Sequence, residues 1–257
     1  MYLFFIFILG LCVGSFLNVV IDRLPNGKSL GGRSYCDHCK RKLAWYDLIP
    51  VISFFILRGE CGYCKKKISW QYPAVELITA ILFVIVYISM YRIIDAPLAL
   101  LSLTLTLIIY SGLITIFFTD FKYQIIPDEI LIVVGVTTIL MHLIFNSSSL
   151  KIGILSGTAL FFIFLALVIL TRGKGMGMGD VKYVFFMGLF LGFPASIVAF
   201  YIAFLTGAGV SLILVVRGAK RFGQTVAFGP FLVVATIVSD IWGEQIWLFF
   251  QRMIGFG

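Results

Sequence analysis

Two aspartates and four cysteines are the residues of this chain whose types and spacing could do chemistry. Asp120 and Asp180 lie sixty residues apart, each where a long apolar segment ends or begins. If these apolar segments cross a membrane, a charged group inside it costs about 2.5–3.5 kcal/mol on insertion scales. A functional role is therefore the first explanation to test. Asp180 closes the string GMGMGD at 175–180, whose glycines permit backbone turns that side chains would forbid.

Two carboxylates that converge inside a membrane protein predict an acid–base pair. When they lie close together they share a proton, because both cannot ionise cheaply. One can then act as base toward a water that attacks a peptide carbonyl, while the other protonates the leaving amine. The alternative is that Asp120 and Asp180 are solvated loop residues at an interface, and position alone leaves both interpretations open.

The cysteines form two C-x-x-C pairs separated by twenty-one residues: Cys36, Cys39, Cys61 and Cys64. Four thiolates in two knuckles are typical of a tetrahedral structural zinc site. A domain this small has too little core of its own, so the metal would supply much of its folding free energy. The alternatives are two disulfides or four free thiols, and a cytosolic location argues against stable disulfides.

Membrane helices must position these residues. The chain has 257 residues, of which 61% are hydrophobic and 12% charged, more apolar surface than a soluble domain of this size can bury. Apolar runs suited to crossing a bilayer predict eight spans, at about 2–21, 73–94, 97–118, 130–145, 150–171, 181–193, 195–216 and 227–250. The fourth and sixth are short, so seven or six helices with re-entrant pieces are the alternatives.

The predicted fold is therefore an all-α polytopic membrane protein of about eight transmembrane helices. A small cytosolic zinc-knuckle domain lies between the first helix and the second. The predicted parts are a first transmembrane helix at 1–21, the four-cysteine zinc-binding domain at 22–72 and a transmembrane domain at 73–257. Within the second part, the apolar run 48–57 is too short to span, which indicates an interfacial or packed segment.

The basic residues predict the orientation. With the N-terminus outside and all eight segments crossing, seventeen of the twenty Lys and Arg lie inside, and only Arg92, Lys151 and Arg252 lie outside. This asymmetry follows the positive-inside rule and makes both aspartates face the cytosol. The net charge of +8 is thus a signal of topology, and the expected partner is the lipid bilayer, with no nucleic acid.

Several strings occur in a specific order along the chain. They are GSFLNVVI at 14–21, the double C-x-x-C, YPAVE at 72–76, Asp120 with IPD at 126–128, GMGDVK at 177–182 and FGPF at 228–231. This ordered set resembles the bacterial type IV prepilin peptidases, which are membrane aspartic proteases of the G-x-G-D type. The resemblance covers nearly the whole chain.

The resemblance implies that Asp120 and Asp180 are the catalytic pair and that 73–257 is a transmembrane aspartic peptidase domain. It implies type IV prepilin or pseudopilin precursors as substrates, cut after a glycine on the cytoplasmic face of the bacterial inner membrane. Members with the cysteine domain commonly also methylate the new N-terminus with S-adenosylmethionine, so a bifunctional enzyme is expected. No Rossmann-type glycine fingerprint is present, so no residues are assigned to the methyl donor.

Three alternatives stay open: a peptidase without methyltransferase activity, a proton-coupled transporter, and a catalytically silent zinc-bearing scaffold. The aspartates lie near one face rather than at the midplane, and no inverted repeat is visible, which counts against a transporter. A scaffold role does not account for the two aspartates or for the glycine turn.

Four polar residues near the same face have open roles. Glu76 could face the active site, capture a basic leader, or simply begin a helix. Asn18 and Arg23 could anchor the first span at the interface or contact a methylation site. Lys182 is expected to snorkel to lipid headgroups.

Overall fold

The computed structural model describes residues 1–36, 38–91, 98–173, 176–217 and 227–254 of the chain. In these residues the secondary structure is helical, apart from isolated β-bridges in the cysteine region. The chain divides into two compact units, Met1–Thr115 and Ile116–Gly257. An all-α fold is therefore confirmed for the part of the chain that the structure describes.

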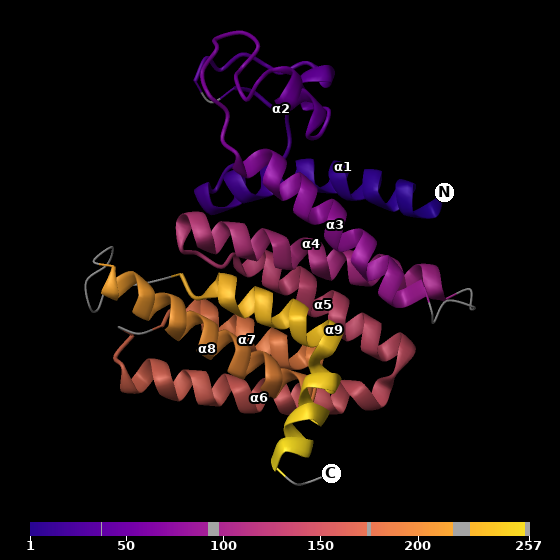
Figure 1. The fold of residues 1–257 in the computed structure, drawn as a ribbon, viewed down its shortest axis with the longest axis vertical. Helices are drawn as coiled ribbons and strands as arrows, with labels where there is room; N and C mark the ends of the chain where they lie inside the picture. Colours follow the sequence, from indigo (N-terminus) through magenta and orange to yellow (C-terminus); the bar gives the residue numbers. More distant parts are fainter. Residues whose placement is uncertain (37, 92–97, 174–175, 218–226, 255–257) are drawn as a thin grey trace. The chain divides into compact units, whose positions relative to one another are not determined.

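The first unit is built on two long helices that run side by side, α1 (Tyr2–Arg23) and α3 (Gln71–Tyr91) (Figure 1). Their close approach depends on small residues, because a Cβ atom placed on Gly14 would lie 2.6 Å from the Cα atom of Glu76. The cysteine-bearing segment joins the end of α1 to the start of α3 and includes the short helix α2 (Ile52–Ile56).

Helix α4 (Ala99–Tyr123) contains the boundary between the units, and its last two turns belong to the second. The other helices of the second unit are α5 (Asp128–Phe145), α6 (Ser147–Leu170), α7 (Met178–Leu191), α8 (Ala195–Val216) and α9 (Gly229–Ile254). Helix α7 packs against α5, α6, α8 and α9, and nine of its fourteen residues are buried. It therefore forms the centre of this unit.

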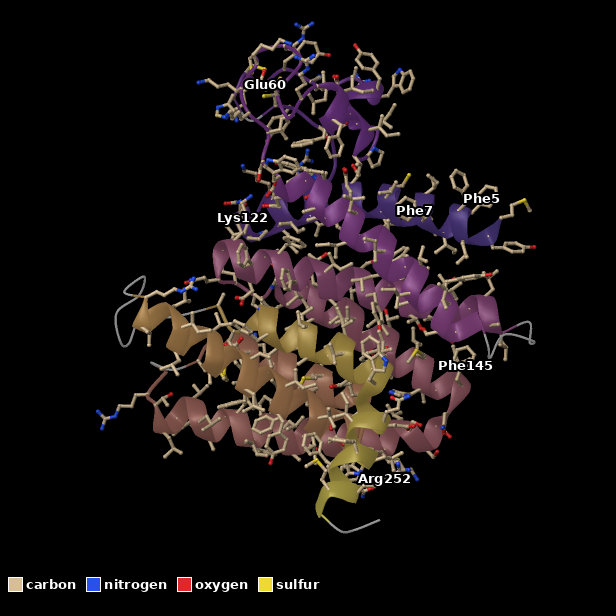
Figure 2. All side chains as sticks on the ribbon, in the orientation of Figure 1. Phe5, Phe7, Glu60, Lys122, Phe145 and Arg252 are labelled. Atoms are coloured by element: carbon tan, nitrogen blue, oxygen red, sulfur yellow. The ribbon has the colours of Figure 1, made fainter. Side chains whose placement is uncertain are left out.

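Seven helices in the described residues are long and apolar enough to cross a membrane: α1, α3, α4, α5, α6, α8 and α9. Large apolar side chains such as Phe5 and Phe145 are exposed on them (Figure 2), as contact with lipid requires. The chain is therefore a multi-pass membrane protein.

The predicted span 181–193 corresponds to α7, which has fourteen residues. At 1.5 Å per residue it is about 21 Å long, less than the roughly 30 Å of a hydrocarbon core. Seven of the eight predicted spans are therefore long enough to cross by themselves, and the eighth, α7, is a short helix buried among its neighbours. Glycines flank α7 on both sides. Gly177 precedes its first turn, and Gly192, which has a positive φ of 63°, follows its last turn and ends the helix.

Candidate active site and metal centre

Asp120 lies one turn before the end of α4 and is buried, with 5% of its surface exposed. Its Oδ2 atom accepts a hydrogen bond of 2.8 Å from the backbone N–H of Gly229. Gly229 is the first residue of α9, where backbone N–H groups have no partner within the helix. The start of the last helix therefore supplies a donor for a carboxylate that comes 109 residues earlier.

Only glycine fits at position 229 without displacing this carboxylate. A Cβ atom placed there would lie 2.6 Å from Asp120 Oδ2 and 2.9 Å from its Cγ. The string FGPF at 228–231 therefore brings a backbone without a side chain against Asp120. The sequence signal for this role was a Gly-Pro pair just ahead of an apolar run.

Asp180 is the third residue of α7 and is also buried, with 8% of its surface exposed. Its Oδ2 atom accepts a 3.1 Å hydrogen bond from the N–H of Gly177, the N-cap residue. A carboxylate at this position is favoured by the unpaired N–H groups of the first helical turn. The described part of the glycine string begins at Met176, and Gly175 lies outside the described residues.

The structure brings Asp120 and Asp180 together within the second unit, near enough for the charge of one to act on the other. Both are buried, each is held by one backbone N–H, and they come from different helices. Two buried carboxylates in mutual range cannot both ionise cheaply, which is the condition for sharing one proton. This arrangement suits general acid–base chemistry on a water molecule.

The loop that precedes α5 supports the glycine turn. Ile126 is buried, and a Cβ atom placed on Gly179 would lie 3.3 Å from the Cβ atom of Ile126. Next to this contact, Lys182 Nζ pairs with both carboxylate oxygens of Asp128, at 2.8 and 2.7 Å. Asp128 is the first residue of α5, as a carboxylate at a helix start should be. Lys182 therefore links α7 to α5.

A buried hydroxyl pair joins α7 to α9 behind the turn. Tyr183 Oη and Thr236 Oγ1 lie 2.9 Å apart, and both side chains are fully buried. Since α9 carries Gly229 and α7 carries Asp180, this bond fixes the two helices that supply the surroundings of the aspartates. Nothing in the sequence singled out either residue, because a tyrosine and a threonine in apolar helices are common.

The four predicted cysteine ligands meet in the first unit. The sulfur atoms of Cys36, Cys39, Cys61 and Cys64 all lie within 4.8 Å of one another, and those of Cys36 and Cys64 are 3.9 Å apart. Zn–S bonds of about 2.3 Å in a tetrahedron place sulfurs about 3.8 Å apart, so the cluster fits a metal such as zinc. The N–H groups of Cys64 and Tyr63 donate to the Cys61 sulfur and lower its pKa to about 7, which favours the thiolate.

The two C-x-x-C knuckles have the same backbone hydrogen bonding. Cys36 and Cys61 each accept, through the carbonyl oxygen, the N–H of the residue four positions later, Lys40 and Lys65. These two lysines both have positive φ, at 55° and 57°. An isolated β-bridge closes each knuckle, Tyr35 to Lys42 and Glu60 to Lys67. The sequence pattern predicted the ligands, whereas this matched hydrogen bonding is seen only in the structure.

The remaining polar residues of the first unit act within it. Asn18 Nδ2 donates to the carbonyl oxygen of Tyr72, and the Arg23 guanidinium donates to four backbone carbonyls of residues 29–33. Glu76 is buried on α3 and accepts the N–H of Val51 at 2.7 Å. The Asn18 contact joins α1 to α3, whereas those of Arg23 and Glu76 connect the cysteine-bearing segment to the helices on either side of it.

Comparison with known proteins places these features in a family. Residues 8–90 match the bacterial peptidase A24 N-terminal domain, and residues 107–212 match the type IV leader peptidase family. A Bacillus subtilis (strain 168) protein named prepilin leader peptidase/N-methyltransferase is 34% identical over 251 residues, which cover 96% of this chain and 97% of the relative. An Aeromonas hydrophila protein of the same name is 31% identical, covering 96% and 92%.

A third relative with this name, from Dichelobacter nodosus, is 31% identical over 95% of this chain and 93% of its own. No solved structure matches the chain. The two family matches lie in order, one containing the cysteine cluster and the other containing both aspartates. The chain therefore belongs to the type IV leader peptidase family.

Proposed function

We propose that this enzyme is a membrane aspartic endopeptidase that removes the basic leader of type IV prepilins or pseudopilins, with Asp120 and Asp180 as its catalytic pair. One observation carries the proposal: two buried carboxylates from different helices come within electrostatic range, each held by a backbone N–H. The names of the relatives, prepilin leader peptidase/N-methyltransferase, support the substrate class.

In the proposed reaction the ionised member of the pair takes a proton from a water molecule. The water oxygen attacks the carbonyl carbon of the glycine that precedes the cleavage point. The protonated member then gives its proton to the amine nitrogen as the peptide bond breaks. Because both carboxylates are buried, little bulk water competes for these protons.

The site is proposed to face the cytosol of a bacterium, with the protein in the inner membrane and its N-terminus outside. The asymmetry of seventeen basic residues against three supports this orientation. The proposed functional parts are the first helix at 1–21, a cytosolic four-cysteine domain at 22–72 with structural zinc, and the peptidase domain at 73–257. Zinc on four thiolates has no open position, so its proposed contribution is to folding.

We further propose that the enzyme methylates the new N-terminal amine after cleavage. S-adenosylmethionine would supply the methyl group, and no residues of the chain are assigned to hold it. The support is the second half of the relatives' printed name and the match of residues 8–90, the region that contains the cysteine cluster.

The test is cleavage of a prepilin by the full chain in lipid nanodiscs, comparing the wild type with Asp120→Asn and Asp180→Asn. Asn keeps the size of the side chain and removes the titratable proton. Each variant should lose at least about 10²–10⁴-fold in rate, the range of general acid–base catalysis. Product size reports cleavage, and product mass with and without S-adenosylmethionine reports the methyl group.

The matched control is Glu244→Gln, which removes an exposed carboxylate from α9. It lies fifteen residues beyond Gly229, about 22 Å along the helix, and should leave cleavage unchanged. Thermal unfolding and metal content show whether each variant is folded. If a folded Asp120 or Asp180 variant cuts at the wild-type rate, that residue is not catalytic. Cleavage without a gain in product mass would support the peptidase activity and contradict the methyltransferase activity.

A further inference from the structure

The short helix α2 has one packed side and one bare apolar side. Phe54 is buried, with 7% of its surface exposed. Its neighbours Ile52, Phe55 and Ile56 are 56%, 57% and 74% exposed, although all three are large and apolar. Such a cluster of exposed apolar side chains on a five-residue helix indicates a partner, because monomers rarely leave contiguous apolar surface to water.

Contacts with Trp70 set the depth of α2 relative to the membrane. Trp70 immediately precedes α3, and the candidate span begins at Gln71. The Trp70 ring centroid lies 4.9 Å from that of Phe54 and 6.3 Å from that of Phe55. Helix α2 therefore lies at the level where α3 enters the bilayer.

A second contact holds the segment against the first two turns of α3. The N–H of Val51 donates to Glu76 Oε2 at 2.7 Å, and Glu76 is the sixth residue of α3. At 1.5 Å per residue, Glu76 is about 7.5 Å inside the start of that span. Val51 has a positive φ of 62°, which is unfavourable for a β-branched residue and persists only when its surroundings impose it. The buried carboxylate of Glu76 is such a constraint.

The composition of the neighbouring residues suits the membrane interface. Trp70 is 68% exposed, and the 3-10 helix Trp45–Leu48, which packs next to α2, exposes 79% of Trp45 and 54% of Tyr46. Trp and Tyr are the residues that concentrate at the level of lipid headgroups. The segment 22–72 also contains ten Lys and Arg against four Asp and Glu, which complements an anionic leaflet.

We propose that Ile52, Phe55, Ile56 and Trp70 form an interfacial patch that inserts into the lipid beside α3. The occupant is the bilayer itself, because the patch continues the lipid-exposed surface of a membrane helix and lies at the depth where that helix begins. The cysteine-bearing segment is then a membrane-docked domain, held on the bilayer surface, and not a freely tumbling cytosolic one. This inference holds whether or not the proposed peptidase activity does.

Depth-dependent quenching of a single tryptophan tests the patch in the full chain. The four native tryptophans are replaced by Phe, and Ile56→Trp is added as the reporter. The matched control is Tyr35→Trp, because Tyr35 is 38% exposed and lies between two cations, Arg23 at 5.8 Å and Lys40 at 5.5 Å from its ring. Both proteins are placed in nanodiscs whose lipids carry bromine on the acyl chains, and metal content verifies the fold.

The reporter Ile56→Trp should be quenched several-fold more strongly than Tyr35→Trp, and dissolved acrylamide should quench in the opposite order. Equal quenching by bromine at the two positions, or strong quenching of Ile56→Trp by acrylamide, would overturn the proposal in favour of a patch facing water. Protection from both quenchers would also overturn it, because protein, such as a second copy or another part of the chain, would then cover the patch.

A second measurement uses the unmodified chain and does not depend on substitutions that could disturb folding. A phospholipid with a photoactivatable group on its acyl chain is crosslinked in nanodiscs, and the adducts are located by mass spectrometry. Adducts on 52–56 without adducts on 38–42 support the patch. Adducts on α3 that leave 52–56 unlabelled overturn it.

Discussion

Replacing Gly229 with Ala should disable the site while leaving the chain folded. The substitution adds one carbon at the point where the backbone of α9 meets Asp120. The added Cβ atom would lie 2.6 Å from Oδ2, 2.9 Å from Cγ and 3.0 Å from Cβ of Asp120. The obstructing group is the short, buried carboxylate side chain of Asp120 near the end of α4, so it has little room to move aside.

The geometry gives the size of the effect. Ordinary contact begins at 3.4 Å, so Asp120 or the start of α9 must shift by about 0.8 Å, and the 2.8 Å hydrogen bond from Gly229 is strained or lost. A misplacement near 1 Å in a catalytic group can lower the rate by about 10²-fold, equivalent to about 2.7 kcal/mol of transition-state stabilisation. Overpacking costs about 1–3 kcal/mol of folding free energy.

The assay is prepilin cleavage under single-turnover conditions, with thermal unfolding of the same preparation. The matched control is Gly135→Ala on α5, where a Cβ atom would meet nothing within 4 Å. This control should cut at the wild-type rate. A folded Gly229→Ala enzyme that also cuts at the wild-type rate would refute the idea that the backbone of Gly229 positions Asp120. Loss of rate in both variants would trace the effect to glycine replacement in general.

Three further outcomes follow from contacts in the two units. In a double-mutant cycle measured by thermal unfolding, Lys182→Met and Asp128→Asn should show a coupling free energy below about 1 kcal/mol, since both side chains are about half exposed. A larger coupling would mean that this ion pair is a main support of the glycine turn before α7. Cys61→Ser replaces the most buried of the four cysteines and should abolish metal binding. The control Cys12→Ser in α1 should retain one metal ion per chain by elemental analysis. Equal metal content in the two variants would exclude the four-cysteine site. Tyr183→Phe should lower stability by about 1 kcal/mol, because it breaks a buried hydrogen bond; an unchanged unfolding temperature would contradict this.

Local spacing and composition were enough to predict the cysteine cluster and most of the helices. The two C-x-x-C pairs lie within twenty-nine consecutive residues, and thiolate ligands at that spacing have few other structural uses. Long apolar runs must form helices in a bilayer, because no water is present to satisfy their backbone groups. Both features depend on residues that are near one another in the sequence.

Hydropathy predicted that α7 is short, but it could not predict that protein and not lipid surrounds the helix. An apolar run that faces lipid and one that is buried by protein have the same composition, and α7 is of the second kind. The ion pair of Lys182 was missed for a related reason, since its partner Asp128 is fifty-four positions earlier in the sequence. The contact of Gly229 with Asp120 spans 109 positions, and no local pattern contains it.

The hydrogen bond from Gly229 to Asp120 also has a consequence for when the enzyme can become active during its synthesis. The cysteine cluster is complete once residue 64 has been made, and both aspartates exist once residue 180 has. The donor for Asp120 comes with α9, the last helix, beyond the 107–212 stretch that matches the leader peptidase family. A chain that stops before Gly229 would thus contain every predicted ligand and both acidic residues without a finished site. We expect that the start of α9 must be synthesised and folded against α4 before proteolysis can begin, which limits premature cleavage by a partly synthesised enzyme.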